Sequence, residues 1–226
     1  MKTGRPIILA ATLVATSLLS GCGYYDLAQM QADQNTILQR QKITTKFAAN
    51  PDTDTWYQQR QQMTQALGDR DFNQDFNRVF DSLTVAISSL ELKVTNMERE
   101  SGYIEASGIT LPPSDAKALR SEAVNNWCTL NGFDPSVLDR PLQSSQMQQY
   151  GDMMDMTQMT AKYDTMQKSV TFQLVKMSDQ QTRVKLRFSD VYYPPELEAY
   201  YKLIWQAVDK QIFVDKTIEG SVENRQ

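Results

Sequence analysis

The chain has 226 residues, a net charge of −4 and no histidine. The negative charge argues against a nucleic-acid partner, because phosphate binding requires a cationic surface. The absence of histidine excludes the commonest general base, Ser-His and Cys-His nucleophiles and the usual zinc sites. A chain of this length can bury a core as one domain with an insertion or as two small domains.

The first 22 residues have the pattern of an export signal. Lys2 and Arg5 form a positive head, and an apolar run of 13 residues covers 7–19. This run is too short to cross the roughly 30 Å hydrocarbon layer as a helix. The segment is therefore expected to be a signal peptide that is removed after export.

The junction Leu19-Ser20-Gly21-Cys22 resembles the lipobox of bacterial lipoproteins. The resemblance implies cleavage before Cys22, a diacylglycerol on its sulfur and an acyl chain such as palmitate on the new amino terminus. Gly23 follows the cysteine where an aspartate would retain such proteins in the inner membrane, so the resemblance also implies the outer membrane. The alternative is an ordinary signal peptide in which Cys22 is incidental.

The cysteine count has its own consequence. If Cys22 carries lipid, Cys128 has no partner within the chain, and no intramolecular disulfide can form.

Removal of residues 1–21 leaves 21 basic and 27 acidic residues, a net charge of −6.

Residues 23–50 are rich in Gln, Asn and Thr. They form either a weak amphipathic helix or a tether that spaces the folded part from the bilayer. The apolar stripe of such a helix would be Leu27, Met30, Gln34, Ile37 and Leu38. Thr53 or Asp54 then caps a second helix that ends at Gly68.

A stronger pattern predicts a helix over residues 72–89. Its apolar residues fall on one continuous stripe, with polar residues opposite. The stripe consists of Phe72, Phe76, Val79, Phe80, Leu83 and Ile87. Asp71 with Gln74 three residues later is typical of a capping box at its start.

Alternation of apolar and polar residues then predicts two β-hairpins, each with one buried face. The first lies in 92–106 with a turn at 100–102, and the second lies in 170–188 with a turn at 179–180. The inward residues are Leu92, Val94, Ile104, Ala106, Val170, Phe172, Leu174, Val184, Leu186 and Phe188.

Two further helices are expected. One is capped by Ser114 or Asp115 and closed by Gly132, and the other opens at Pro194-Pro195. The apolar stripe of the first helix is Leu119, Ala123, Trp127 and Leu130. The apolar stripe of the second helix is Leu197, Tyr201, Ile204, Val208 and Ile212. Residues 134–167 between them lack a regular pattern.

Each hairpin alone would leave an apolar face in water. The expected fold is therefore α+β: a four-stranded antiparallel sheet with helices packed on one face as a two-layer sandwich. The element order over 72–108 and 168–213 resembles the helix-grip and TBP-like domains of outer-membrane lipoproteins, including the lipoprotein subunits of the β-barrel assembly machinery.

These expectations divide the chain into consecutive parts. They are a signal peptide (1–21), a lipidated tether (22–68), a periplasmic α+β domain (69–217) with a helical and irregular insertion (109–167), and a flexible tail (218–226).

A methionine cluster in the insertion is a possible metal site. Met154, Met156 and Met159 resemble the methionine motifs of copper-handling proteins outside the cytoplasm, because thioethers select Cu(I). The alternatives are packing in the core and a partner-binding surface, since methionine adapts to irregular apolar contacts.

Two groups are possible partner-binding residues. The strip Arg183, Lys185 and Arg187 points outward from the sheet, where it either is simply solvated or meets anionic lipid or an acidic partner. Exposed rings suit protein contacts. The tyrosines expected to be exposed are Tyr192, Tyr193 and Tyr200.

Catalytic motifs are not recognisable in the sequence. Asp69, Asp71 and Asp75 could supply paired carboxylates, but helix capping explains them more simply. Cys128 is expected to be a small buried residue near a helix C-terminus, where the dipole opposes a thiolate.

The sequence therefore predicts a non-catalytic lipoprotein without a cofactor other than its covalent lipid. It would serve as a scaffold or accessory subunit of an envelope assembly, held at the periplasmic face of the outer membrane through Cys22, with an envelope protein as partner. The alternative is a Met-rich lipoprotein that binds Cu(I) or a small ligand.

Overall fold

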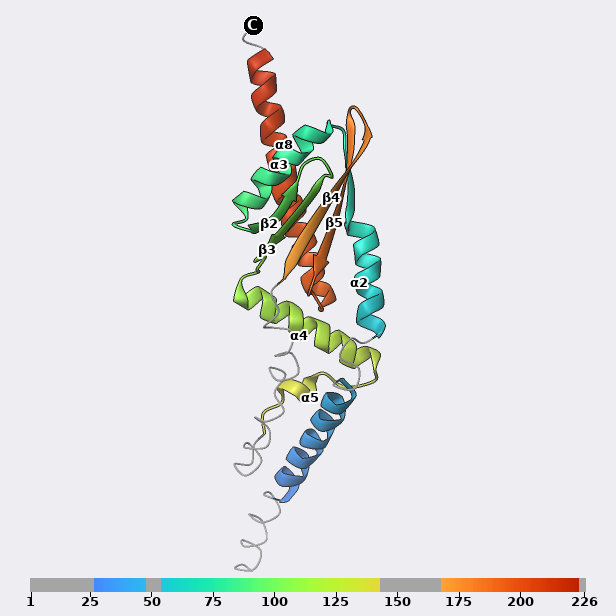
Figure 1. The fold of residues 1–226 in the computed structure, drawn as a ribbon. Helices are drawn as coiled ribbons and strands as arrows, with labels where there is room; N and C mark the ends of the chain where they lie inside the picture. The colour runs from blue at the N-terminus through green and yellow to red at the C-terminus, as the bar shows by residue number, and fades with distance from the viewer. Residues whose placement is uncertain (1–26, 48–53, 143–167, 224–226) are drawn as a thin grey trace, which may run out of the picture. The chain divides into compact units, whose positions relative to one another are not determined.

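The computed structural model describes residues 27–47, 54–142 and 168–223 (Figure 1). The chain forms two compact units. One comprises Met1–Ala49 and Gly132–Met159, and the other comprises Asn50–Asn131 and Thr160–Gln226.

The described part of the first unit contains a helix over residues 27–47 and the short helix α5 (Ser136–Asp139). Arg40 joins them: its Nε donates to the Val137 carbonyl at 2.9 Å, and its guanidinium also donates to the Arg140 carbonyl. The predicted apolar stripe of the longer helix is wrong, because Leu27 and Leu38 are exposed. The buried positions are Asp33, Thr36, Arg40, Ile43 and Phe47.

The second unit is built on an antiparallel sheet in the order β1-β5-β4-β3-β2. The strands are β1 (Asp69–Phe72), β2 (Lys93–Glu98), β3 (Tyr103–Ser107), β4 (Ser169–Ser178) and β5 (Gln181–Ser189). Both predicted hairpins are present, and β3 pairs with β4 to join them. The α+β class is confirmed, but the sheet has five strands where four were expected.

The additional strand, β1, occupies residues that were assigned to a helix and its cap. Phe72 pairs with Thr182 of β5. The helix α3 (Phe76–Ser89) begins later, with Asp75 as N-cap, whose side chain accepts from the Arg78 amide at 3.1 Å. The capping box of Asp71 and Gln74 is therefore wrong, because backbone pairing with β5 extends through residue 72.

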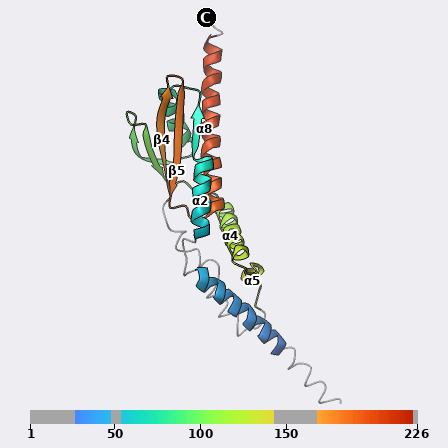
Figure 2. The same cartoon turned by 90° about the vertical axis from the view of Figure 1, so that its right-hand side faces the viewer.

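Helices α3 and α8 (Pro194–Glu223) cover one face of this sheet, as Figures 1 and 2 show together. Between the layers lie the alternating inward residues of β3, β4 and β5, and the predicted stripe of α8 is buried throughout. Tyr201 of that stripe donates its hydroxyl to the Leu186 carbonyl at 3.3 Å, and Trp205 Nε1 donates to the Leu67 carbonyl at 2.7 Å. Burial of apolar side chains on the scale of this cluster is the main force that holds the layers together.

Two further helices pack against α8: α2 (Asp54–Leu67) and α4 (Pro113–Leu130). Neither Ser114 nor Asp115 caps α4, because the helix begins with Pro113 in its first turn and Pro112 as N-cap. Gly132 closes the helix with a φ of 75°, as expected for a left-handed C-cap. Leu130 is exposed, so the predicted stripe of this helix is wrong at its last position.

Candidate functional site

Two of the predicted sites lie outside the described residues. These are the lipidation site, Cys22, and the methionine group of Met154, Met156 and Met159. Both remain predictions.

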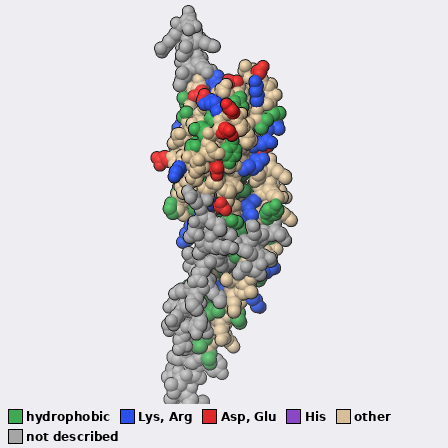
Figure 3. Space-filling model, viewed as in Figure 1, with side chains coloured by type: hydrophobic (Ala, Val, Ile, Leu, Met, Phe, Trp, Pro, Cys, Tyr) green, Lys and Arg blue, Asp and Glu red, His purple; other side chains and the backbone are tan. Residues whose placement is uncertain are grey.

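The strip Arg183, Lys185 and Arg187 lies on the sheet face that α3 and α8 leave uncovered. Figure 3 shows basic and acidic side chains interspersed on this side of the molecule. Strand β1 supplies the acids, because Asp71 pairs with Arg183 and Asp69 with Lys185 in the strand register. The Arg183 guanidinium donates to both carboxylate oxygens of Asp71 at 2.6 and 2.8 Å, and Arg187 Nη1 lies 2.8 Å from Asp69 Oδ1.

These pairs change the electrostatics of the strip. The hydrogen bonds and charge of Arg183 hold the pKa of the Asp71 carboxyl below its usual value. Two of the three cations thus have an aspartate beside them, and Lys185 is the most exposed of the three. The strip therefore presents much less positive charge to a partner than its sequence indicates.

The tyrosines around the Pro-Pro corner are less accessible than predicted. Tyr193 and Tyr200 are each only 1% exposed, so the expectation that they form an exposed surface is wrong. Tyr193 packs edge-on against Trp56, with ring centroids 5.3 Å apart. Tyr192 is half-buried, and the Arg60 guanidinium lies 5.6 Å from its ring centre.

Cys128 is fully buried in α4, as expected for a small core residue. Burial raises the pKa of its thiol to about 11. The thiol is therefore protonated at neutral pH, which disfavours a role as a nucleophile.

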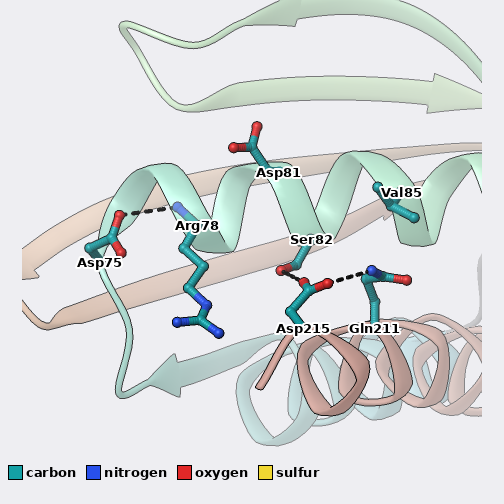
Figure 4. Close-up of a pocket in the computed structure, with 7 residues that line it drawn as sticks. All are labelled: Asp75, Arg78, Asp81, Ser82, Val85, Gln211 and Asp215. Atoms are coloured by element: carbon teal, nitrogen blue, oxygen red, sulfur yellow. Dashed lines mark hydrogen bonds between the residues drawn. The ribbon is translucent and has the colours of Figure 1, made fainter. Parts of the chain in front are cut away.

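A groove of about 510 Å³ runs between α3 and α8 (Figure 4). Its three acidic residues are all engaged: Asp75 caps α3, Asp81 pairs with Arg99, and Asp215 accepts from Ser82 at 2.6 Å and from Gln211 at 2.8 Å. The bond between Ser82 and Asp215 links the two helices, so these carboxylates are better explained as structural than as catalytic.

A second pocket, of about 330 Å³, lies at the first turn of α8. We call it the Glu196 pocket; its charged lining residues are Arg120 of α4, Lys168 immediately before β4, and Glu196. Glu196 is 1% exposed, and its Oε1 lies 3.4 Å from Arg120 Nη2 and 3.5 Å from Lys168 Nζ. The sequence analysis missed this site, because its residues are far apart in the chain and follow no motif.

Tyr200 completes the polar wall of the Glu196 pocket. Its hydroxyl donates to Glu196 Oε1 at 3.2 Å. Burial, together with the neighbouring carboxylate, raises the pKa of Tyr200, so the phenol stays protonated and can donate this bond.

Within the described ranges, no group of three or more His, Cys, Asp or Glu side chains is arranged to hold a metal ion. None of the helices in that same part of the chain combines the length and apolar character needed to cross a membrane. No protein-family model matches the chain, and no curated protein is significantly similar to it.

Proposed function

We propose that this protein is a lipid-anchored, non-catalytic component of a Gram-negative envelope that acts as a scaffold or accessory subunit. The observation that carries the proposal is the sequence Leu19-Ser20-Gly21-Cys22 directly after a short apolar run. Two acyl chains suffice for a stable anchor, because each buried methylene contributes about 0.8 kcal/mol.

The use of charged residues in the folded unit supports a binding role over a catalytic one. The sheet face pairs Arg183 with Asp71 and Arg187 with Asp69, and the α3–α8 groove uses Asp215 to join two helices. A sheet with one polar, uncovered face offers an area on which a partner protein could dock.

The anchor is tested by membrane fractionation of cells that express Cys22→Ser or Cys128→Ser. We expect the Cys22 variant to leave the membrane fraction and the Cys128 variant, which keeps the lipidation site, to remain in the outer membrane. A membrane-bound Cys22 variant would contradict the anchor, and a wild-type protein in the inner membrane would contradict the assignment to the outer one.

The partner surface is tested by crosslinking in intact membranes. Lys185→Glu reverses the most exposed charge of the strip without removing either Arg–Asp pair, and Lys202→Glu is the control, a charge reversal at an exposed lysine of α8. Selective loss of a stoichiometric crosslinked partner from the Lys185 variant would support docking on the sheet face. Equal yields from both variants would place docking elsewhere.

The methionine motif keeps a second function open. Three thioethers at Met154, Met156 and Met159 are suitable ligands for Cu(I). Titration of the protein with Cu(I) against a competing chelator tests this function, with Leu at the three positions as the control. Equal copper uptake by both proteins would exclude it.

A further inference from the structure

Strand β2 is an edge of the sheet. Among the described residues it pairs only with β3, so its other side forms the edge opposite β1 (Figure 1). All of its residues except Val94 are exposed. An edge strand presents backbone N–H and C=O groups that can pair with a strand of another molecule. The side chains of β2 therefore decide which strand it accepts.

A β-bulge sets the direction of these side chains. The register with β3 shifts between Val94 and Asn96, so Thr95 is an extra residue in β2. Residues five apart point to opposite faces of a regular strand, because successive side chains alternate. The extra residue reverses this alternation and puts Lys93 and Glu98 on the same face, together with Asn96.

The other face of β2 is apolar. Val94 pairs with Ala106 and Met97 with Ile104, and both partners are fully buried beneath the helices. Val94 packs against the core, whereas Met97 remains 47% exposed, with its Sδ 3.8 Å from Thr84 Oγ1 of α3. The edge therefore leaves a large apolar side chain half in water.

The charges of β2 are not neutralised within the part of the chain that the structure describes. Neither Lys93 nor Glu98 has an ion-pair partner there, and Glu98 Oε2 accepts only from Ser101, at 2.7 Å. Charged residues on an edge strand oppose unspecific pairing. A strand that pairs with β2 must therefore place an acid opposite Lys93 and a base opposite Glu98.

We propose that β2 pairs antiparallel with β2 of a second copy of this chain, about a two-fold axis through Asn96. Without the bulge residue Thr95, the paired positions are 93, 94, 96, 97 and 98, and Asn96 is the middle one. The pairs across the axis are Lys93 with Glu98, Val94 with Met97, and Asn96 with Asn96. Opposite charges and apolar side chains stabilise a sheet as cross-strand pairs, and an amide can both donate and accept. This inference is independent of the lipid anchor.

The other edge of the sheet, β1, does not have this self-complementarity. An axis through Arg70 places Arg70 opposite itself and Asp69 opposite Asp71, and an axis through Asp71 places Asp71 opposite itself. Like charges directly opposite each other destabilise a sheet. Self-pairing is thus confined to β2, and the assembly closes as a dimer.

A single cysteine at the axis tests the geometry. Opposite Cα atoms of antiparallel strands are about 4.5–5.5 Å apart, which is within the range of a disulfide. In cells treated with a thiol oxidant, we expect a reducible dimer from Asn96→Cys and none from Met177→Cys, an exposed position near the end of β4. The unaltered chain controls for Cys22 and Cys128.

Charge reversal tests the pairing. Lys93→Glu or Glu98→Lys puts like charges opposite each other at both ends, so sedimentation of the purified full chain should show self-association weakened by about tenfold. A mixture of the two variants restores opposite charges and should associate about as well as the unaltered chain. Lys202→Glu, at an exposed lysine of α8, should leave self-association unchanged.

Several results would overturn the proposal. In the crosslinking test they are no dimer from Asn96→Cys, an equal dimer from Met177→Cys, or a crosslink from Asn96→Cys only to a different protein. In the charge test they are unchanged association of the single variants or a mixture that associates no better than either variant. Membrane fractionation does not depend on β2, so failure of this proposal and failure of the lipid anchor can be told apart.

Discussion

The uncovered sheet face and the Glu196 pocket use positive charge in contrasting ways. On the sheet, each of Arg183 and Arg187 has its own aspartate from the neighbouring strand, and the pairs are partly exposed. In the pocket, Arg120 and Lys168 share the single carboxylate of Glu196, which is buried. The comparison teaches that the basic strip recognisable in sequence is largely neutralised by exposed aspartates of the next strand, whereas Arg120 and Lys168 converge on one buried carboxylate.

Of the substitutions considered, removal of the shared carboxylate of Glu196 should reduce the stability of the fold most. Glu196→Gln removes the buried carboxylate that Arg120 and Lys168 share, and we expect a loss of about 3 kcal/mol in the free energy of unfolding. Arg120→Gln should cost less, because Lys168 still pairs with Glu196. Urea denaturation of the three proteins checks this order, and a Glu196 variant as stable as wild type would contradict it.

The pairs on the sheet face depend on β1, and β1 depends on Gly68. A Cβ at residue 68 would lie 2.4 Å from the Thr64 carbonyl oxygen and 3.0 Å from that of Leu186. Gly68→Ala should therefore displace β1 and reduce the free energy of unfolding by about 2 kcal/mol.

Gly108→Ala is the control for Gly68. Its Cβ would meet no atom within 4 Å, so the substitution introduces only the strain of alanine at a φ of 87°. This strain should reduce the free energy of unfolding by about 1 kcal/mol. Thermal melting compares the variants, and a Gly68 variant more stable than the Gly108 variant would show that β1 tolerates the extra atom.

Substitution of Cys128 should have a smaller effect on the stability of the fold. Burial raises the pKa of its thiol to about 11, above the value of about 8.5 expected in the unfolded chain. The protonated thiol thus favours the folded state fully below about pH 8.5, and this contribution is lost as the pH rises towards 11.

Cys128→Ser should remove this pH dependence and cost about 1 kcal/mol, because a hydroxyl is less readily buried. Denaturation at several alkaline pH values measures both effects. Rapid alkylation of Cys128 at pH 8 in the native protein would contradict its burial.

Breaking the exposed pair of Asp71 and Arg183 should have the smallest effect on stability. Arg183 lowers the pKa of the Asp71 carboxyl, so the pair stabilises the fold above the unfolded pKa of aspartate, about 3.9. This contribution is lost as the pH falls through the lower folded pKa.

Asp71→Asn should therefore reduce the melting temperature slightly at pH 7 and hardly at all at very low pH. High salt should shrink the difference, because exposed charges are screened. A difference that is larger in acid than at pH 7 would show the opposite sign and refute the role of this pair.

Much of the second unit could be predicted from sequence, because its elements have strong periodic patterns. The stripe of α8 and the inward residues of β3, β4 and β5 are buried as expected, except that Phe188 is only partly buried. Strand β1 could not be found this way, since Asp-Arg-Asp-Phe has three charged residues and no apolar alternation. It is a strand because β5 lies beside it and the Leu186 amide donates to the Gly68 carbonyl at 2.6 Å.

The candidate sites were less predictable, because tertiary packing decides them. Tyr200 lies off the main stripe of α8, but it is buried on a helix that also contacts α4. Arg120, Lys168 and Glu196 come from three separate segments, and only the folded chain brings them together. The aspartates that neutralise the basic strip were missed with β1.

The central claim is that the chain works as a lipid-anchored docking protein, and its most direct test is mass spectrometry of the amino-terminal peptide of the mature protein. We predict a peptide that begins at Cys22 and carries a diacylglycerol on sulfur and an acyl chain on nitrogen. An unmodified Cys22 in protein recovered from the soluble fraction would contradict the account.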